Sequence, residues 1–229
     1  MGGKNPLVVL DDANLEVAVG AAINGAFFST GQRCTASSRL IVTAGVHDEF
    51  VAAMRAALDK LVVGHALDPA TTIGPVVDER QLRRNMDYLE IAKSEGATVV
   101  GGELLQRDTI GNFQKPALLL DTHPAMRINQ EEIFGPIASV IKVADPDTAL
   151  AVANDVPFGL SAGICTTSHA QVRRFQRGLQ AGMVMVNLPT AGVDYHVPFG
   201  GRKGSSLGPR EQGSYAKEFY TICKTVYVG

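Results

Sequence analysis

The sequence predicts an α/β fold: an open, twisted, mostly parallel sheet with helices on both faces and an edge strand at the C-terminus. Short apolar runs of strand length alternate with longer segments whose apolar residues recur at helical spacing. The alternation repeats along the chain, and repeated strand–helix–strand units form parallel sheets with right-handed crossovers. In an open sheet of this kind we expect a functional site at the carboxyl ends of the strands.

The first half of the chain starts with a strand and continues with helices and strands in turn. Asp11 and Asp12 offer caps for the first helix, because short polar side chains accept hydrogen bonds from the N–H groups at helix starts. Gly96 ends the last helix of this half, since glycine adopts the left-handed conformation that follows many helices. The expected elements are a strand at 7–10, a helix at 15–26, a strand at 40–43 and helices at 48–61 and 79–95.

The second half continues the pattern after a glycine-rich turn at Gly101-Gly102. A segment at 188–213 is rich in Pro, Gly, Ser and charge and is too long for a simple connection. Tyr195 and Phe199 within it favour an ordered loop. The other elements are strands at 117–120 and 138–143, a helix at 147–154, a strand at 160–166, a helix at 171–180 and a strand at 183–186.

The last residues of the chain alternate as an edge strand would, with apolar side chains at every second position or nearly so from Tyr220 to Val228. Edge strands commonly pair with another chain. We therefore expect a homo-oligomer, a dimer or a tetramer, with subunit contacts in this region. The predicted organisation is one large domain at 1–215 and an oligomerisation strand at 216–229.

Composition excludes several classes of protein. The chain has 229 residues, 45% of them apolar, and its net charge of -2 comes from 21 basic and 23 acidic residues spread along it. Charges this balanced and dispersed create no electrostatic field that would attract nucleic acid or an anionic membrane. No apolar run reaches the ~20 residues of a membrane-spanning helix. Three widely spaced cysteines and the lack of a secretion signal predict a cytoplasmic protein without a disulfide framework.

Cys34 is the most informative single residue. A lone cysteine is more often a small buried hydrophobe than a reactive group, and Cys165 and Cys223 fit that description. Cys34, however, lies between small and polar residues just before a strand, next to Arg33. Positive charge or aligned backbone N–H groups lower the pKa of a thiol, so we expect Cys34 to be reactive.

Two other runs attract attention, although each has an ordinary structural explanation. The run Glu131 to Pro136 places paired carboxylates before an aromatic residue and a Gly-Pro break, and taken alone it is a solvated turn. The run Val197 to Ser206 is glycine-rich but lacks the spacing of a phosphate-binding loop, and no G-x-G-x-x-G motif occurs. The five histidines have no metal-binding spacing, so we predict no metal site.

Taken together, these three runs resemble the aldehyde dehydrogenase superfamily along essentially the whole chain. The family signatures look like Gly31-Gln32-Arg33-Cys34 for the nucleophile, Glu131 to Pro136 for the nicotinamide-side loop and Pro198-Phe199-Gly200-Gly201 for the substrate loop. The opening Met1-Gly2-Gly3-Lys4-Asn5-Pro6 is similar to the family segment E-[LM]-G-G-K-x-P without its first residue.

That first residue matters, because in the family it is the general-base glutamate. The resemblance also places a dinucleotide-binding domain, and an asparagine that stabilises the oxyanion, upstream of Met1. The 1–215 domain is then a catalytic thiol domain separated from its cofactor domain. We expect the 229-residue chain by itself to oxidise aldehydes weakly or not at all.

The resemblance implies a reaction through covalent intermediates on the thiol. Cys34 attacks an aldehyde to give a thiohemiacetal, hydride passes to NAD or NADP, and water hydrolyses the resulting thioester to an acid. Glu132 would bind the nicotinamide ribose, with Phe134 packed beside it. Glu211 matches a proton-relaying carboxylate, although an exposed ion pair is nearly as good an explanation. Phe199 matches a substrate-pocket aromatic, and anchoring its loop is an alternative role.

The resemblance also implies a particular substrate. The segments 187–196 and 208–213 look like the branch that oxidises 2-oxoglutarate semialdehyde. That substrate carries a carboxylate, and Arg33 is our candidate to bind it, because charge-assisted hydrogen bonds are strong. Two alternatives stay open: a thiol esterase that hydrolyses an acyl-Cys34, and a non-catalytic fragment that associates through its tail and exposed apolar surface.

Overall fold

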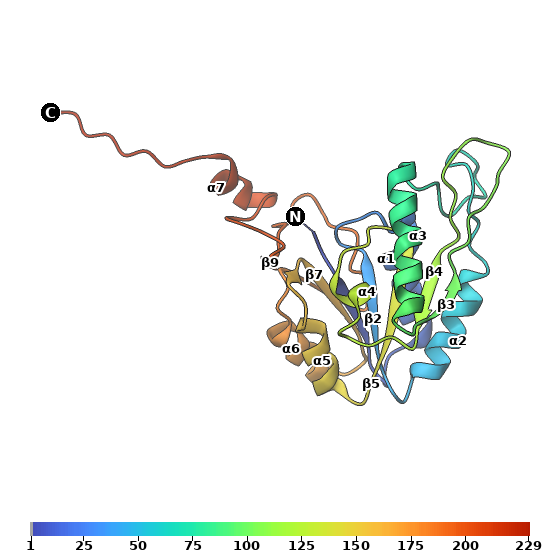
Figure 1. The fold of residues 1–229 in the computed structure, drawn as a ribbon. Helices are drawn as coiled ribbons and strands as arrows, with labels where there is room; N and C mark the ends of the chain where they lie inside the picture. The colour runs from blue at the N-terminus through green and yellow to red at the C-terminus, as the bar shows by residue number, and fades with distance from the viewer. Residues whose placement is uncertain (1) are drawn as a thin grey trace.

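The computed structural model describes residues 2–229, and the predicted role of Met1 in the opening motif lies outside the described residues. The main sheet has seven strands, and its neighbours pair in parallel except at one antiparallel edge (Figure 1). The strands are β1 (Asn5–Val9), β2 (Ser37–Thr43), β3 (Thr98–Gly101), β4 (Ala117–Leu120), β5 (Ile137–Val143), β7 (Ser161–Cys165) and β8 (Met183–Val186). Their spatial order is β3-β4-β5-β2-β1-β7-β8, so the predicted α/β class is confirmed.

Helices cover both faces of this sheet, as predicted. They are α1 (Leu15–Phe27), α2 (His47–Leu58), α3 (Glu79–Ser94), α4 (Arg127–Gln130), α5 (Pro146–Asn154), α6 (His169–Gly178) and α7 (Ala216–Tyr220), with short 3-10 turns η1 (Phe28–Gly31) and η2 (Gly213–Tyr215). A two-stranded sheet of β6 (Phe158–Gly159) and β9 (Arg202–Lys203) lies apart from the main one. In the described residues, no helix combines the length and apolar character needed to cross a membrane.

The alternation of side chains along β1 shows why both faces need cover. Leu7 and Val9 are fully buried in one apolar cluster with α1 and α2, whereas Val8 and Leu10 belong to a second cluster with α5 and α6. A third cluster joins α3 and α4 to β4. Strands buried on both faces give continuous apolar runs, which is why the sequence revealed them.

The predicted helix and strand positions agree with the structure to within a few residues, but the cap of α1 does not. Asn14 caps α1, and its side-chain oxygen accepts a hydrogen bond from the N–H of Val17 at 3.1 Å. Asp11 instead accepts a hydrogen bond from the hydroxyl of Thr43, and Asp12 accepts one from Thr166. The two carboxylates therefore tie strand ends together.

Two elements differ from the prediction for physical reasons. Thr98–Gly101, next to the predicted Gly101-Gly102 turn, forms the edge strand β3. It pairs antiparallel with β4, because the chain reverses direction between the two strands. The strand predicted over the tail is not formed in the single chain: α7 covers Ala216–Tyr220, and 221–229 extend away from the body without regular structure (Figure 1). A strand needs a partner for its backbone groups, and the chain alone provides none there.

Arg39 is the largest fully buried side chain and joins three elements. It lies on β2 with no exposed surface, and its guanidinium donates hydrogen bonds of 2.9 Å to the carbonyls of Lys4, Val152 and Ala153. The last two carbonyls belong to the end of α5, where backbone acceptors lack helical partners. Burial lowers the pKa of Arg39 to about 9, which leaves the side chain charged at neutral pH.

We predict that Arg39→Met destabilises the chain by about 3 kcal/mol or more, because three buried carbonyls lose their donors. Urea unfolding followed by circular dichroism measures the loss. Arg173→Met is the matched control, since Arg173 is exposed on α6 and should change the free energy of unfolding by less than about 0.5 kcal/mol. A loss below about 1 kcal/mol in Arg39→Met would show that the guanidinium does not hold α5 in place.

Candidate active site

The predicted site residues gather at the amino ends of the parallel strands, not at the carboxyl ends. Cys34 lies just before β2, and Glu132 and Phe134 lie in the loop before β5. Gly2 and Gly3 lead into β1, which lies beside β2 at the centre of the sheet. The expectation of a site at the carboxyl ends is therefore wrong for these residues. At the carboxyl end of β1, Asp11 and Asp12 are already bonded to threonine hydroxyls.

The loop that carries Cys34 follows a strained turn. In η1, Ser29 and Thr30 have φ values of 55° and 58°, and Gly31 continues in the same region at 64°. A Cβ atom on Gly31 would lie 2.1 Å from the carbonyl oxygen of Gly135. Only glycine permits this approach, which packs the Cys34 loop directly against the loop that carries Glu132.

Glu132 is anchored to the start of β1. The backbone N–H of Gly3 donates to Oε1 of Glu132 at 2.9 Å, and a Cβ on Gly2 would come within 2.6 Å of Oε2. Gly3 is equally confined, because its Cβ would lie 2.4 Å from the carbonyl oxygen of Cys34. The glycine pair thus brings the Cys34 backbone and the Glu132 carboxylate to the same strand end.

The neighbouring residues of this loop have different environments. Glu131 accepts hydrogen bonds from Arg127 at 2.8 and 3.1 Å and from the hydroxyl of Tyr88 at 2.6 Å. These donors lower the pKa of Glu131 to about 2, so it acts as an ion-pair partner. Phe134 has a φ of 65° and is 37% exposed, so part of its aromatic ring faces solvent.

The pKa of the Cys34 thiol is raised, contrary to the sequence-based expectation. Burial of the half-exposed thiol is the main cause, and the negative charge of Glu132 adds to it. The backbone N–H groups of Cys34 and Thr35 act in the opposite direction. Arg33 does not contribute, because its guanidinium turns away and donates to the α1 carbonyls of Asn24 and Gly25.

Arg33, Glu132 and Phe134 line one small cavity of about 10 Å³ together with Gly3 and Gly31. This volume holds at most a single water molecule. Burial lowers the pKa of Arg33, and its Nε atom is buried without a partner among the described residues.

Phe199 and Glu211 form a second group in the long loop. Their backbones pair as an isolated antiparallel bridge, with the N–H of Phe199 donating to the Glu211 carbonyl at 2.7 Å and the reverse bond at 3.0 Å. Both line an open cavity of about 460 Å³, together with Ser205 and Phe219. The predicted ordered loop is thus confirmed.

Three buried residues that connect these groups were missed by the sequence analysis. Ser205 donates a hydrogen bond of 2.7 Å to the carbonyl of Gly2 and accepts one from the N–H of Gly159 at 3.0 Å, and it so joins the long loop to the start of β1. Asn5 and Thr190 bond the carbonyls that follow Cys34. A buried amide or hydroxyl has no periodicity or spacing, so no sequence signal identified them.

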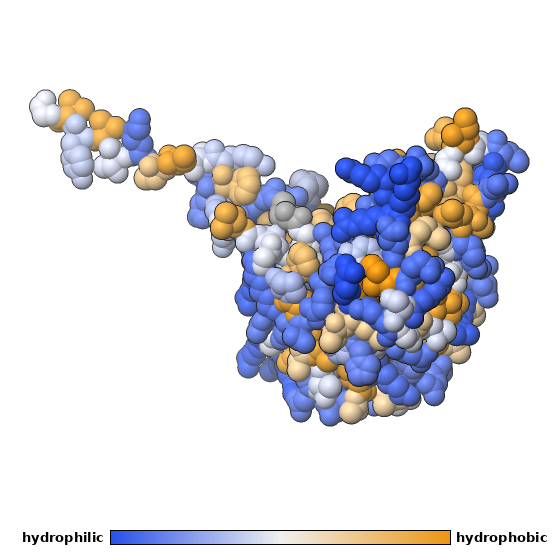
Figure 2. All heavy atoms as spheres, viewed as in Figure 1, coloured by the Kyte–Doolittle hydropathy of each residue, from blue (hydrophilic) through white to orange (hydrophobic). Residues whose placement is uncertain are grey.

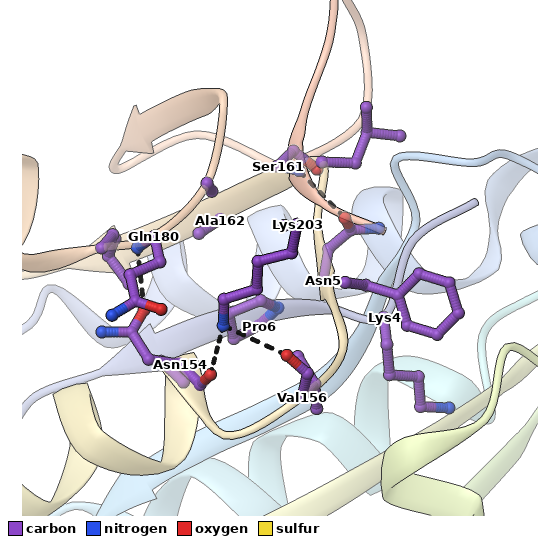
Figure 3. Close-up of a pocket in the computed structure, with 15 residues that line it drawn as sticks. Lys4, Asn5, Pro6, Asn154, Val156, Ser161, Ala162, Gln180 and Lys203 are labelled. Carbon is purple, nitrogen blue, oxygen red and sulfur yellow. Dashed lines mark hydrogen bonds between the residues drawn. The ribbon is translucent and has the colours of Figure 1, made fainter. Parts of the chain in front are cut away.

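Lys4 lies beneath the site with its amine fully buried. The Nζ atom has no hydrogen-bond partner among the described residues, and burial with the nearby charge of Arg39 lowers the pKa of Lys4 to about 7. Glu132 and Glu131 act in the opposite direction. Figure 3 shows Lys4 and Asn5 beside a narrow pocket, where Lys203 donates to the carbonyls of Asn154 and Val156. Among the described residues, no three acidic, histidine or cysteine side chains cluster as metal ligands would.

A thiol beside a carboxylate at the amino edge of an α/β sheet is the arrangement found in this chain, and comparison with known proteins identifies the class. Residues 1–226 match the aldehyde dehydrogenase family, and the chain belongs to that family. The resemblance inferred from the three sequence runs is thereby confirmed.

Two of the relatives that match this chain are semialdehyde dehydrogenases. The chain is 48% identical to an alpha-ketoglutarate semialdehyde dehydrogenase of Haloferax volcanii over 99% of its length, and 44% identical to an alpha-ketoglutaric semialdehyde dehydrogenase of Bacillus subtilis over 100%. These alignments span 48% and 47% of the relatives, so the chain spans about half the length of the curated relatives that it matches.

Solved structures agree on the fold. HpcC from Thermus thermophilus superposes with a TM-score of 0.93 at 39% identity, covering 99% of this chain and 45% of that one. Betaine aldehyde dehydrogenase from Staphylococcus aureus, solved in complex with NAD+, gives a TM-score of 0.93 at 35% identity, covering 97% and 44%.

We predict that Glu132→Gln makes Cys34 more reactive toward iodoacetamide near neutral pH, by about threefold, or half a pKa unit. The reason is that the Glu132 charge raises the pKa of the thiol, while glutamine keeps an oxygen for the Gly3 N–H. Mass spectrometry of the Cys34 peptide measures the rate. Glu131→Gln is the control, because Glu131 is paired with Arg127 and Tyr88 instead. Equal rates in both variants would contradict the assigned electrostatics.

Proposed function

We propose that this chain provides the catalytic thiol part of an NAD(P)-dependent aldehyde dehydrogenase, in which Cys34 is the nucleophile. The observation that carries the proposal is the convergence of Cys34, the Gly2-Gly3 start of β1 and Glu132 at one edge of the sheet, in a chain of this family. Residues 1–215 are the catalytic unit in this proposal. NAD and NADP both remain candidates, and the structural relatives solved with NAD+ support this cofactor class.

The reaction proposed for Cys34 follows from its surroundings. Its sulfur attacks the aldehyde carbon as thiolate and forms a carbon–sulfur bond, while the carbonyl oxygen gains negative charge near the Cys34 N–H. A nicotinamide cofactor, held by Glu132 and Phe134, would supply the hydride acceptor for this adduct. The resulting thioester on Cys34 is cleaved by water, which releases the acid and restores the thiol. Because burial and Glu132 raise the pKa of Cys34, attack is faster at high pH.

Glu132 and Phe134 fit a nicotinamide riboside. Oε1 of Glu132 is occupied by the Gly3 N–H, whereas no described donor bonds Oε2, which leaves an acceptor for a sugar hydroxyl. Phe134 supplies an exposed aromatic face in the same loop. These two features support the proposed role of the pair in binding the nicotinamide ribose.

The proposed substrate is 2-oxoglutarate semialdehyde, which the names of two relatives support. Phe199 lines the open cavity of about 460 Å³ and serves as the apolar wall for the substrate chain. Glu211 shares this cavity and serves as the proton-relaying carboxylate. Arg33 is the proposed partner of the substrate carboxylate; because its Nη2 bonds the end of α1 and its Nε is buried, Nη1 is the nitrogen that would bind it.

The tail is proposed as the contact between subunits of a homo-oligomer. Figure 2 shows apolar side chains along the segment that leaves the body, and Ile222, Val226 and Val228 are 70 to 96% exposed. Exposed apolar side chains on an extended backbone favour strand pairing with a second chain. The proposal also places the protein in the cytoplasm, consistent with three free cysteines.

Cys34→Ala in the protein that carries this chain should lower kcat for 2-oxoglutarate semialdehyde by about 10³-fold or more, since the step that forms the thioester disappears. Reduced cofactor and carboxylic acid are both measured. Cys223→Ala is the control, because Cys223 is exposed in the tail and should keep full activity. An active Cys34→Ala enzyme would refute the proposed nucleophile.

Removal of 221–229 should convert the oligomer to a smaller species, because the exposed tail then has nothing to pair. Light scattering coupled to size-exclusion chromatography measures the mass of both forms. The double change Ile222→Ser and Val226→Ser is a milder variant of the same test. If the intact chain is a monomer, or if removal leaves the mass of the assembly unchanged apart from the lost residues, the tail is not the contact.

A further inference from the structure

Asn5 is a buried amide at the start of β1, and all its hydrogen-bonding groups are used. Its Nδ2 donates to the carbonyls of Cys34 and Ala36, both at 2.9 Å, and its Oδ1 accepts from the N–H of Ser161 at 3.0 Å (Figure 3 shows the last bond). Two carbonyls can only accept and one N–H can only donate, which fixes the orientation of the amide. Only 2% of Asn5 is exposed.

The next carbonyl of the same loop is held in the same way. Thr190, fully buried, donates from its hydroxyl to the carbonyl of Thr35 at 2.7 Å and contacts the hydroxyl of Ser37 at 2.7 Å. Three successive carbonyls after the thiol are therefore bonded to side chains from β1 and from the segment after β8. The backbone of the Cys34 loop is fixed from beneath.

The orientation of a carbonyl determines the orientation of the next N–H. In a trans peptide, the C=O of one residue and the N–H of the following one point in opposite directions, and the described chain contains no cis peptide. When Asn5 draws the Cys34 carbonyl inward, the N–H of Thr35 must point outward. The Thr35 N–H, together with the N–H of Cys34 itself, lowers the pKa of the Cys34 thiol against burial and Glu132, which raise it.

We infer that Asn5 is a positioning residue that orients the Cys34–Thr35 peptide so that its N–H faces the sulfur and stabilises the thiolate. The inference rests on the proposed function only in treating Cys34 as the nucleophile. The charged side chain that acts on the sulfur is Glu132 from the loop before β5, while Arg33 is turned toward α1. Neither Glu132 nor Arg33 is bonded to Asn5, so a change at position 5 leaves both in place.

The test is the pH profile of Cys34 alkylation by iodoacetamide in the 229-residue chain. Cys223→Ser removes the exposed competing thiol, and Cys165 is buried with its pKa raised to about 12. Asn5→Ala should move the midpoint of the profile up by about one pH unit, a tenfold smaller thiolate fraction below it. Asn5→Ser, which keeps one donor, should restore part of this shift.

Asn154→Ala is the matched control, because Asn154 makes the same kind of side-chain bonds at the C-terminal end of α5, to Gly178 and Gln180, and neither bond involves the Cys34 loop. It should lower the melting temperature without moving the midpoint. Should Asn5→Ala fail to fold, Asn5→Leu tests the same peptide with a side chain of similar length and no donor, and it should also raise the midpoint.

Distinct outcomes separate this inference from the proposed function. Folded Asn5→Ala and Asn5→Ser with the wild-type midpoint, or Asn5→Leu with the wild-type midpoint where Asn5→Ala does not fold, would overturn the positioning role. An upward shift equal to that of Asn154→Ala would do the same, since it would reflect general destabilisation. Lack of any Cys34 alkylation in the wild-type chain would instead refute the nucleophile itself.

Discussion

The parallel pairing of β1 with β2 on one side and β7 on the other is the interaction on which the site depends. Asn5 pairs with Ser37 at the first position of the β1–β2 register, and Leu7 pairs with Gly163 on β7. Because parallel strands keep their amino ends at one edge, this register places the Gly2-Gly3 segment beside Cys34. The Gly2-Gly3 backbone can approach Cys34 this closely only because glycine has no side chain. The Cys34 loop therefore packs against the start of a strand whose five residues are all buried.

Polar groups beneath that edge are few and nearly all satisfied. Arg39 on β2 bonds the backbone of Lys4, just before β1, and the end of α5. One guanidinium therefore connects β2, the start of β1 and α5. Asn5 and Thr190 fix the carbonyls after Cys34, and Ser205 fixes the carbonyl of Gly2. Buried donors of this kind are costly to leave unpaired, so each bond restricts the loop to a single conformation. The rigidity of the thiol site follows from these bonds.

Opposing electrostatic effects act on the pKa of the Cys34 thiol. Burial and the Glu132 carboxylate disfavour the thiolate of Cys34, while two backbone N–H groups favour it. A nucleophile with a raised pKa is less ionised at neutral pH but more nucleophilic once ionised. Fixed N–H dipoles need no rearrangement as charge develops, which suits a reaction in which negative charge moves from sulfur to oxygen. In the proposed function, the Glu132 charge would link the reactivity of the thiol to the binding of the nicotinamide ribose.

The sequence by itself determined the layers, the order of the elements and the family, because apolar periodicity and three short motifs survive in one dimension. It also singled out Cys34, Glu132 and Phe134 as candidate site residues, although not as neighbours in space. The tertiary structure decided which edge of the sheet holds them, where Arg33 points and what orients the Cys34 backbone. These depend on strand register and on single buried hydrogen bonds, such as those of Asn5, whose partners lie 29 to 156 residues away in the chain. Periodicity in the sequence carries no record of such distant pairs.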